Sequence, residues 1–377
     1  MKVIVFGVGR QGERILELLV STDKYEVSVF DKSVRRLKYI EKKYENSVEV
    51  LNNVPELKTP DFNSFLKPFD IIVDALPSVH SYGLMKKVVE SGKKMVSVSY
   101  LEEDFMKFDG DAKSKGALII PDCGAAPGLS HLLAGYSAKR LKNPKSVIMK
   151  VGAIPKEPVP PFNHNITWSA FDLIQEYIRD AKIKNNGKFV NIRPLSKIFK
   201  EKVLEMELES FYTDGVRSFF TSFPEIPEVE ERTLRYKGHL DFMKALEVTG
   251  FLTNERIETD NFDLIPSEFL AYLFENRFKK LPEEDIFLME ILVSSDGKKE
   301  IHTYLMEYDN ENRVSALVNS VAITAFVMIE MIANGEITEK GVFPLEKLAN
   351  DDIYKKMIKT HEDLGAKYRF EIKNEEG

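Results

Sequence analysis

The chain has 377 residues, of which 43% are hydrophobic and 30% are charged, and its formal net charge at pH 7 is −7. A chain of this length and composition has enough apolar residues for two hydrophobic cores, so we expect two domains. The acidic balance argues against a nucleic-acid partner, and the single cysteine, Cys123, excludes intrachain disulfides and thiolate metal clusters.

The N-terminal segment carries a dinucleotide-binding fingerprint. A hydrophobic strand is expected over residues 3–6, it leads into the pattern Gly7-x-Gly9-x-x-Gly12, and residues 13–19 follow with helical spacing. Gly7 permits a tight turn, Gly9 lets backbone N–H groups approach a pyrophosphate, and Gly12 allows the helix to pack against the strand. The flanking strand and helix make this pattern more specific than three glycines alone.

The residue that ends the second expected strand indicates which cofactor is bound. This strand covers residues 26–30 and is followed by Asp31. A carboxylate there accepts hydrogen bonds from the adenosine ribose hydroxyls and repels a 2′-phosphate, so NAD is expected and NADP is less favoured. Arg35 and Arg36 are either solvated helix residues or a counter-charge for a 2′-phosphate.

Strands and helices continue to alternate after Asp31. The expected helices cover residues 33–44, 80–91 and 103–115, and the expected strands cover residues 48–51, 70–75, 95–99 and 117–121. With the first two strands, this makes six parallel strands in a doubly wound α/β Rossmann sheet, which we assign to residues 1–126. Ligands of such sheets bind beyond the carboxyl ends of the strands, so the loops at 75–77, 97–100 and 122–127 are expected to frame the reaction centre.

The pattern changes after residue 126. Strands expected at 146–154, 203–209 and 286–294 mix with helices expected at 129–141, 170–177 and 240–248. This predicts a second α+β domain with a mixed, mostly antiparallel sheet over residues 127–314.

The C-terminal part, residues 315–377, is expected to be a helical segment that packs back on the first domain. Its apolar stretch over residues 316–333 is interrupted by Asn319 and Glu330, so a buried or subunit-facing helix is favoured over a membrane span.

Four further segments complete a family pattern. They cover residues 122–131, 166–169, 213–218 and 233–239. Together with the fingerprint, and in this order, they resemble the saccharopine dehydrogenase superfamily, and within it most closely the NAD-dependent L-lysine dehydrogenases (lysine 6-dehydrogenase). The resemblance implies a Rossmann domain joined to a substrate domain, and NAD(P)-dependent oxidation of a carbon that bears an amine.

Three positions refine this resemblance. Saccharopine-oxidising members typically carry an acidic residue immediately before the Pro127-Gly128 pair, whereas this chain has Ala126, as in the lysine dehydrogenase branch. His131 stands where these lysine dehydrogenases tend to have Asn, and Asn319 stands where the family commonly has Arg.

The expected site residues fall into three groups. Those expected to bind the cofactor are Gly7, Gly9, Arg10, Gln11, Gly12, Asp31, Ala75, Leu76, Pro77, Ser97, Ser99 and Pro127. Those expected to bind substrate are Tyr100, Gly128, Trp168, Arg217, Arg235 and His239. Those expected to be catalytic are His131, Asp122 and Glu176.

The chemistry of an amino-acid substrate explains these choices. A planar guanidinium is the best partner for an α-carboxylate, which makes Arg235 the first candidate and Arg217 the second, the alternative for each being a structural salt bridge. Hydride transfer needs a neutral amine, so a base must remove a proton from the substrate ammonium, and His239 is a further candidate for that role. The lone tryptophan, Trp168, either packs in a core or lines the pocket.

The expected function is therefore NAD-dependent oxidative deamination of an amino-acid amine, with the side-chain amine of L-lysine as first choice. The alternatives are a saccharopine or related secondary-amine dehydrogenase, and a catalytically silent NAD-binding protein that acts in sensing or assembly. The six histidines are scattered without metal-ligand spacing, so no metal is expected. A cytoplasmic location is expected, since the chain begins with a strand.

A homodimer is also expected. Apolar runs at residues 219–226 and 326–329 would be covered by a second copy of the chain, and the family resemblance implies subunit contacts through the second domain.

Overall fold

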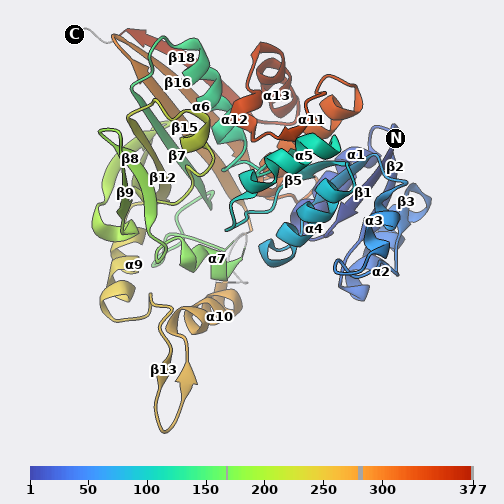
Figure 1. Cartoon of the computed structure of the whole chain (residues 1–377). Coiled ribbons are helices and arrows are strands. Elements are labelled where there is room, and N and C mark those ends of the chain that lie inside the picture. The colour runs from blue at the N-terminus through green and yellow to red at the C-terminus, as the bar shows by residue number, and fades with distance from the viewer. Residues whose placement is uncertain (167–168, 279–282, 375–377) are drawn as a thin grey trace. The chain divides into compact units, whose positions relative to one another are not determined.

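The computed structural model describes residues 1–166, 169–278 and 283–374, and it divides the chain into two compact units (Figure 1). The first unit comprises Met1–Leu132 and Val318–Asp363. The second comprises Leu133–Leu317 and Leu364–Gly377. Each unit is therefore assembled from two separate stretches of the chain.

The first unit contains a seven-stranded parallel sheet with the order β17-β6-β5-β4-β1-β2-β3. Its strands are β1 (Lys2–Phe6), β2 (Glu26–Phe30), β3 (Val48–Val50), β4 (Ile71–Asp74), β5 (Lys94–Ser97), β6 (Leu118–Ile120) and β17 (Gly341–Val342). The six strands predicted from the N-terminal region are confirmed. The seventh, β17, comes from the C-terminal region and pairs with β6.

Helices flank this parallel sheet (Figure 1). They are α1 (Arg10–Val20), α2 (Val34–Tyr44), α3 (Asp61–Leu66), α4 (Ser78–Glu90), α5 (Asp109–Lys115), α11 (Ala316–Ala333), α12 (Leu345–Leu348) and α13 (Asp351–Asp363). Helix α1 shows why the elements pack: Ile15, Leu16 and Leu19 share one helix face and are fully buried, as are the inward residues of the adjacent strands. Continuous burial of strands such as β1 is typical of a parallel sheet covered by helices.

The long apolar helix α11 has the length and hydropathy of a membrane span, and 78% of its residues are buried in the structure. Such burial is a property of a core helix. Asn319, Ser320 and Thr324 lie within it and are buried as well.

The second unit contains a nine-stranded mixed sheet with the order β10-β11-β12-β7-β15-β16-β18, to which β8 and β9 are attached through β12. Its strands are β7 (Ser146–Pro155), β8 (Ala181–Asn185), β9 (Lys188–Ile192), β10 (Phe199–Val203), β11 (Met206–Tyr212), β12 (Glu228–Tyr236), β15 (Asp285–Ser295), β16 (Lys298–Glu307) and β18 (Lys367–Asn374). Strands β12 and β7 are parallel, and the other pairs are antiparallel. The predicted α/β class, with a parallel Rossmann sheet and a second mixed sheet, is confirmed.

The remaining helices are α6 (Leu129–Arg140), α7 (Ala170–Gln175), α8 (Phe219–Ser222), α9 (His239–Val248) and α10 (Pro266–Phe278). A short hairpin of β13 (Ile257–Glu258) and β14 (Asp263–Leu264) projects from the second unit (Figure 1).

Two expectations about secondary structure are wrong. Residues 203–209 do not form one strand, because Leu204 and Glu205 adopt φ values of 50° and 64° and make the turn between β10 and β11. The C-terminal segment is not helical throughout, because Lys367–Asn374 forms β18 against β16.

The apolar runs that suggested a dimer are also accounted for within the chain. Phe219 and Ile226 are fully buried, and Phe220 and Phe223 are 7% and 8% exposed. Val327, Met328 and Ile329 are at most 1% exposed. These buried residues give no support to a second subunit, and the homodimer stays a prediction.

Candidate functional site

The glycine-rich turn between β1 and α1 has the geometry of a phosphate cradle. Gly7 has a φ of +86°, and a Cβ there would lie 2.5 Å from the Ala75 carbonyl oxygen. A Cβ on Gly12 would lie 1.9 Å from the carbonyl oxygen of Gly7. A Cβ on Gly9 would meet nothing within 4 Å, and Gly9 caps α1 without any side chain. Open space in front of a helix N-terminus fits a pyrophosphate.

Asp31 is fixed at the end of β2 by backbone donors. The Val8 N–H donates to Asp31 Oδ2 at 2.9 Å, and the Ser33 N–H donates to Oδ1 at 2.8 Å. The neighbouring Arg36 donates from Nε to the Val8 carbonyl at 2.5 Å and forms an ion pair with Glu13. Glu13 also pairs with Lys43, so this one carboxylate is shared by two cations.

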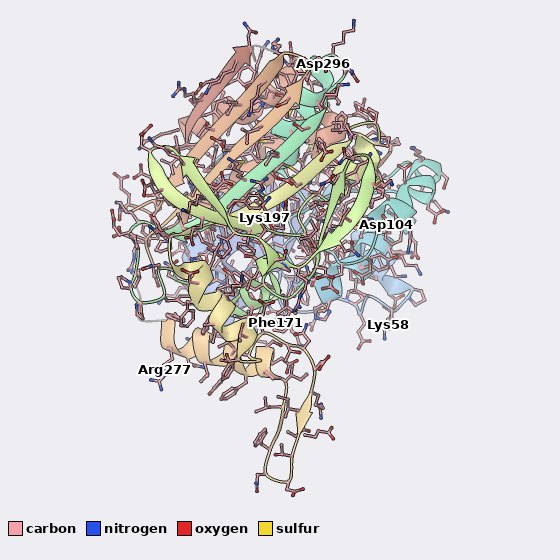
Figure 2. All side chains as sticks on the ribbon, turned by 90° about the vertical axis from the view of Figure 1, so that its left-hand side faces the viewer. Lys58, Asp104, Phe171, Lys197, Arg277 and Asp296 are labelled. Atoms are coloured by element: carbon pink, nitrogen blue, oxygen red, sulfur yellow. The ribbon has the colours of Figure 1, made fainter. Side chains whose placement is uncertain are left out.

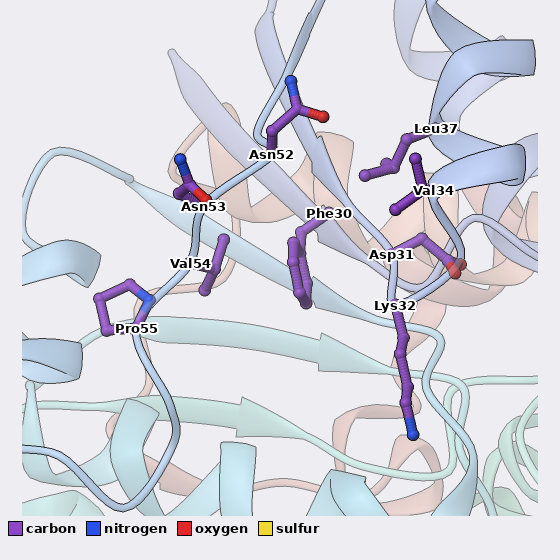
Figure 3. Close-up of a pocket in the computed structure, with 9 residues that line it drawn as sticks. All are labelled: Phe30, Asp31, Lys32, Val34, Leu37, Asn52, Asn53, Val54 and Pro55. Atoms are coloured by element: carbon purple, nitrogen blue, oxygen red, sulfur yellow. The ribbon is translucent and has the colours of Figure 1, made fainter.

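A cavity of about 550 Å³ opens beside Asp31 (Figure 3). One wall comes from the segment after β2 and the other from the segment after β3, and the lining residues are Phe30, Asp31, Lys32, Val34, Leu37, Asn52, Asn53, Val54 and Pro55. Apolar walls with two asparagine amides, the Asp31 carboxylate and the Lys32 ammonium fit an adenosine moiety. The residues from Asn52 to Pro55 were missed in the sequence, where they carry no motif.

Asp74 organises the loop at the end of β4. It is fully buried, and it accepts hydrogen bonds from the Leu76 N–H at 3.1 Å, from Ser97 Oγ at 2.7 Å and from Ser81 Oγ. Burial raises the pKa of Asp74, and these hydrogen bonds oppose that rise. Ser99 Oγ donates to the Leu76 carbonyl at 2.7 Å. Ser97 and Ser99, predicted to bind the cofactor, therefore donate their hydroxyl protons within the protein.

Of the loop residues beside this network, Ala75 and Leu76 are half-buried and Pro77 is exposed, as are Gly9 and Arg10 at the glycine turn. Gln11, Tyr100 and Pro127 are half-buried.

The loop after β6 is tightly folded. Asp122 has a φ of +48°, and a Cβ on Gly128 would lie 2.1 Å from the carbonyl oxygen of Gly124. The Leu129 N–H donates to that same carbonyl at 2.9 Å, which ties the loop to the start of α6. Asp122 is 5% exposed and His131 is 2% exposed, with His131 Nδ1 3.1 Å from Ser130 Oγ. Their catalytic roles stay predictions.

Arg235 in the second unit lies at the centre of a buried polar network. Its guanidinium is fully buried and donates to Glu176 Oε2 at 2.6 Å, to the Tyr177 hydroxyl at 2.9 Å and to the Leu234 carbonyl at 2.9 Å. The Glu176 side chain is 33% exposed. Glu176 is the residue immediately after α7, and the exposed Phe171 of that helix is labelled in Figure 2. Removal from water raises the pKa of Glu176, and the charge of Arg235 opposes that rise.

The network continues through His239 in a defined direction. His239 Nδ1 lies 2.9 Å from the Phe162 carbonyl, which only accepts, so this nitrogen carries the proton. Burial lowers the pKa of His239 to about 3, so the ring is neutral and Nε2 accepts. The Tyr177 hydroxyl, 2.7 Å from Nε2, therefore donates to His239 and accepts from Arg235. His239 positions Tyr177, and the network fixes Arg235 beneath Glu176.

Glu231 is a buried carboxyl group that sequence reasoning missed. It is 5% exposed, and Thr213 Oγ1 donates to its Oε1 at 3.3 Å. Burial, together with the charges of Glu176 and Asp214, raises the pKa of Glu231 to about 8. Glu231 lies two residues before Thr233 and four before Arg235, and alternate residues of a strand share a face. This spacing could have indicated that Glu231 lies on the same face as Arg235.

The structure thus brings Glu176, Arg235 and His239 into one network. Arg217 is half-buried, with a φ of 47°, and its charge acts on Glu231. Trp168 lies outside the described residues. Among the residues described, no three or more His, Cys, Asp or Glu side chains are grouped as metal ligands would be.

The parallel sheet, the glycine turn and the adenosine-sized cavity define a pyridine-nucleotide-binding domain. Residues 3–120 match the family model described as "Saccharopine dehydrogenase NADP binding domain", and residues 124–365 match "Saccharopine dehydrogenase C-terminal domain". The chain belongs to the saccharopine dehydrogenase family. The predicted superfamily is confirmed.

Individual relatives are distant in sequence. The chain is 26% identical over 277 residues to mitochondrial alpha-aminoadipic semialdehyde synthase from Bos taurus, covering 69% of this chain and 29% of the relative. It is 20% identical over 357 residues to saccharopine dehydrogenase (NADP(+), L-glutamate-forming) from Saccharomyces cerevisiae, covering 90% of this chain and 74% of the relative. The chain therefore spans under a third of the length of the bovine relative.

The fold matches a solved structure closely. Histidine-tagged saccharopine dehydrogenase (L-Glu forming) from Saccharomyces cerevisiae superposes with a TM-score of 0.77 at 15% identity. The match covers 98% of this chain and 99% of the other. Likeness at this identity establishes a shared fold.

Proposed function

We propose that this protein is a pyridine-nucleotide-dependent dehydrogenase that oxidises the carbon bearing an amino-acid amine, with the side-chain amine of L-lysine as substrate and NAD as cofactor. Family membership supports an oxidoreductase acting on such amines. The observation that carries the choice of a cationic amine is the Glu176 carboxylate, which is one-third exposed and held by a fully buried Arg235. A half-buried, fixed carboxylate is a partner for a substrate ammonium.

The proposed reaction assigns each group a task. Glu176 pairs with the substrate ammonium, Arg235 holds Glu176, and Arg217 is the candidate partner of the α-carboxylate. A base removes one proton from the ammonium, and bound NAD supplies the hydride acceptor. Water then hydrolyses the resulting imine to an aldehyde and ammonia.

Arg235 was first expected to contact the substrate α-carboxylate, and this scheme gives it a different role. Its guanidinium donates to Glu176, Tyr177 and a backbone carbonyl, so direct contact with a substrate carboxylate requires it to give up a bond. We therefore propose Arg235 as a positioning residue.

The choice of NAD rests on Asp31 and Arg36. The carboxylate of Asp31 is held at the end of β2 beside the adenosine-sized cavity, where a 2′-phosphate would meet its negative charge. Arg36 is paired with Glu13, whereas Lys32 lines the cavity beside Asp31. The names of the yeast relative and of the N-terminal family model point instead to NADP, so both nucleotides belong in the test.

Saccharopine is the second candidate substrate, because relatives carry its name. It bears three carboxylates, whereas Glu176 presents a negative charge and Ala126 supplies no polar group. A lysine substrate suits these two residues better.

The test is formation of reduced nucleotide with lysine, saccharopine and a panel of other amino acids, each with NAD and with NADP. Lysine with NAD is expected to give the highest kcat/KM. Preference for saccharopine would replace the substrate proposal within the family. Nucleotide binding without turnover of any amine would favour the silent NAD-binding protein.

A further inference from the structure

One face of β12 carries three buried polar residues in a row. Glu231, Thr233 and Arg235 alternate along the strand, so their side chains share a face of the sheet, and all three are at most 6% exposed. Arg235 ends the row beneath Glu176, the proposed partner of the substrate amine. Glu231 ends the row on the other side, and Thr233 lies between them.

Two threonine hydroxyls, those of Thr213 and Thr233, form a hydrogen-bonded chain that ends at Glu231. Thr213 Oγ1 donates to Glu231 Oε1 at 3.3 Å and lies 2.9 Å from Thr233 Oγ1. A threonine hydroxyl has one proton to donate. While Glu231 is ionised, Thr213 donates its proton to Glu231, so Thr233 is the donor to Thr213. The hydroxyls are therefore aligned so that a proton entering at Thr233 is relayed toward Glu231.

The surroundings of the Glu231 side chain favour the protonated form of its carboxyl group. Gly215 lies over its carboxyl group, and a Cβ there would fall 1.7 Å from Oε1. Its second oxygen, Oε2, is buried without a hydrogen-bond partner among the described residues. A carboxyl group in such a place is easier to keep neutral than charged.

Two of the three charged groups that face Glu231 raise its pKa. Glu176 from the end of α7 and Asp214 from the segment after β11 raise its pKa, and Arg217 from that segment lowers it. Burial has the largest effect, and the resulting pKa is about 8. A base works best when its pKa lies near the working pH.

We propose that Glu231 is the proton acceptor of the amine site, reached through the hydroxyls of Thr233 and Thr213. This proposal rests on the proposed function. The substrate ammonium loses one proton to Thr233 Oγ1, the Thr233 proton passes to Thr213, and the Thr213 proton passes to Glu231 Oε1. Both hydroxyls end unchanged, the Glu231 carboxylate becomes a carboxylic acid, and the amine is left neutral for hydride loss.

Glu176 is less suited to this task. A proton on Glu176 would cancel its ion pair with Arg235 and leave a fully buried guanidinium without its carboxylate. Breaking a buried pair in this way is strongly unfavourable. Glu176 therefore stays ionised and binds the substrate ammonium, while Glu231 accepts the proton.

The test compares Glu231→Gln with Glu230→Gln in the full chain. Both substitutions replace one carboxyl group of β12 by an amide, but the Glu230 side chain pairs with Arg232 and is no part of the proposed relay. Glu231→Gln keeps an acceptor for Thr213. The kcat/KM for lysine is measured against pH, and the Glu231 carboxyl group is titrated by infrared difference spectroscopy without substrate.

The wild type and Glu230→Gln are expected to show kcat/KM rising with pH as Glu231 ionises. Glu231→Gln is expected to lose this rise and roughly 100-fold of the rate. Thr213→Val, which removes the relay hydroxyl and leaves Glu231, should lower the rate comparably while the infrared titration of Glu231 persists. An unchanged pH profile in Glu231→Gln would overturn the proposal.

The infrared titration separates this proposal from the proposed function. A carboxylic acid band that disappears near pH 8 in the wild type and is missing in Glu231→Gln supports a stored proton, even if lysine is not the substrate. A Glu231 already ionised at pH 6 overturns the proposal, whichever amine is oxidised.

Discussion

The buried Glu231 should make the stability of the second unit depend on pH in a way that Glu231→Gln abolishes. Its pKa is raised from 4.5 to about 8 in the folded protein, chiefly by burial. The folded protein therefore holds this proton more tightly than the unfolded chain does. The stabilising effect is complete below pH 4.5 and is lost progressively as the pH rises through 8.

The size of the effect follows from that difference in pKa. One pH unit corresponds to about 1.4 kcal/mol, so the free energy of unfolding should fall by roughly 5 kcal/mol across this window through Glu231 alone. Only 5% of the residue is exposed, so solvent screening takes little from this value. A glutamine does not titrate and should show no such fall.

The assay is chemical unfolding followed by the fluorescence of the single tryptophan in the sequence. Unfolding free energies of the wild type, Glu231→Gln and Glu230→Gln are measured from pH 4 to pH 9. Glu230→Gln should follow the wild-type slope, which controls for the replacement of a β12 carboxyl group by an amide. Parallel pH dependences of the wild type and Glu231→Gln would refute the reasoning.

Three further predictions concern the other sites. Asp31→Ala should weaken NAD binding and narrow the preference for NAD over NADP in calorimetric titrations, and tighter binding of NADP by the wild type would contradict the ribose assignment. Gly12→Ala should abolish nucleotide binding and lower the melting temperature, since its Cβ would lie 1.9 Å from a carbonyl oxygen, whereas Gly9→Ala should melt like the wild type. Arg235→Ala leaves Glu176 without its partner and should reduce kcat/KM for lysine about 100-fold or more. Unchanged kinetics would show that Arg235 does not position the site.

The first unit could be predicted well because its signals are local. The spacing of Gly7, Gly9 and Gly12 and the alternation of strands and helices each occupy a short stretch of sequence. Strand β17 could not be predicted in the same way, because two residues carry no periodicity and their pairing with β6 links distant parts of the chain. The adenosine-sized cavity could not be predicted either, because the residues after β3 that line it form no sequence motif.

The site of the second unit could be predicted only in part. Arg235, Glu176 and His239 were identified one by one, but nothing in the sequence shows that Arg235 donates to Glu176 and Tyr177. Glu231 was missed because it stands beside Glu230, and two adjacent acids look like a solvated edge. Which of the two is buried depends on the face that β12 turns inward, and that is decided by packing across the sheet.

The discontinuous make-up of both units affects how the protein can be synthesised. Until residues beyond 340 leave the ribosome, β6 offers an open edge, and the bonds from the Gly341 N–H to Ala117 and from the Phe343 N–H to Ile119 are missing. The second sheet waits still longer for β18. Open edges invite pairing with other chains. A premature stop anywhere before residue 340 would thus damage both sheets at once, and a nascent chain of this protein depends on protection of its edges late into translation.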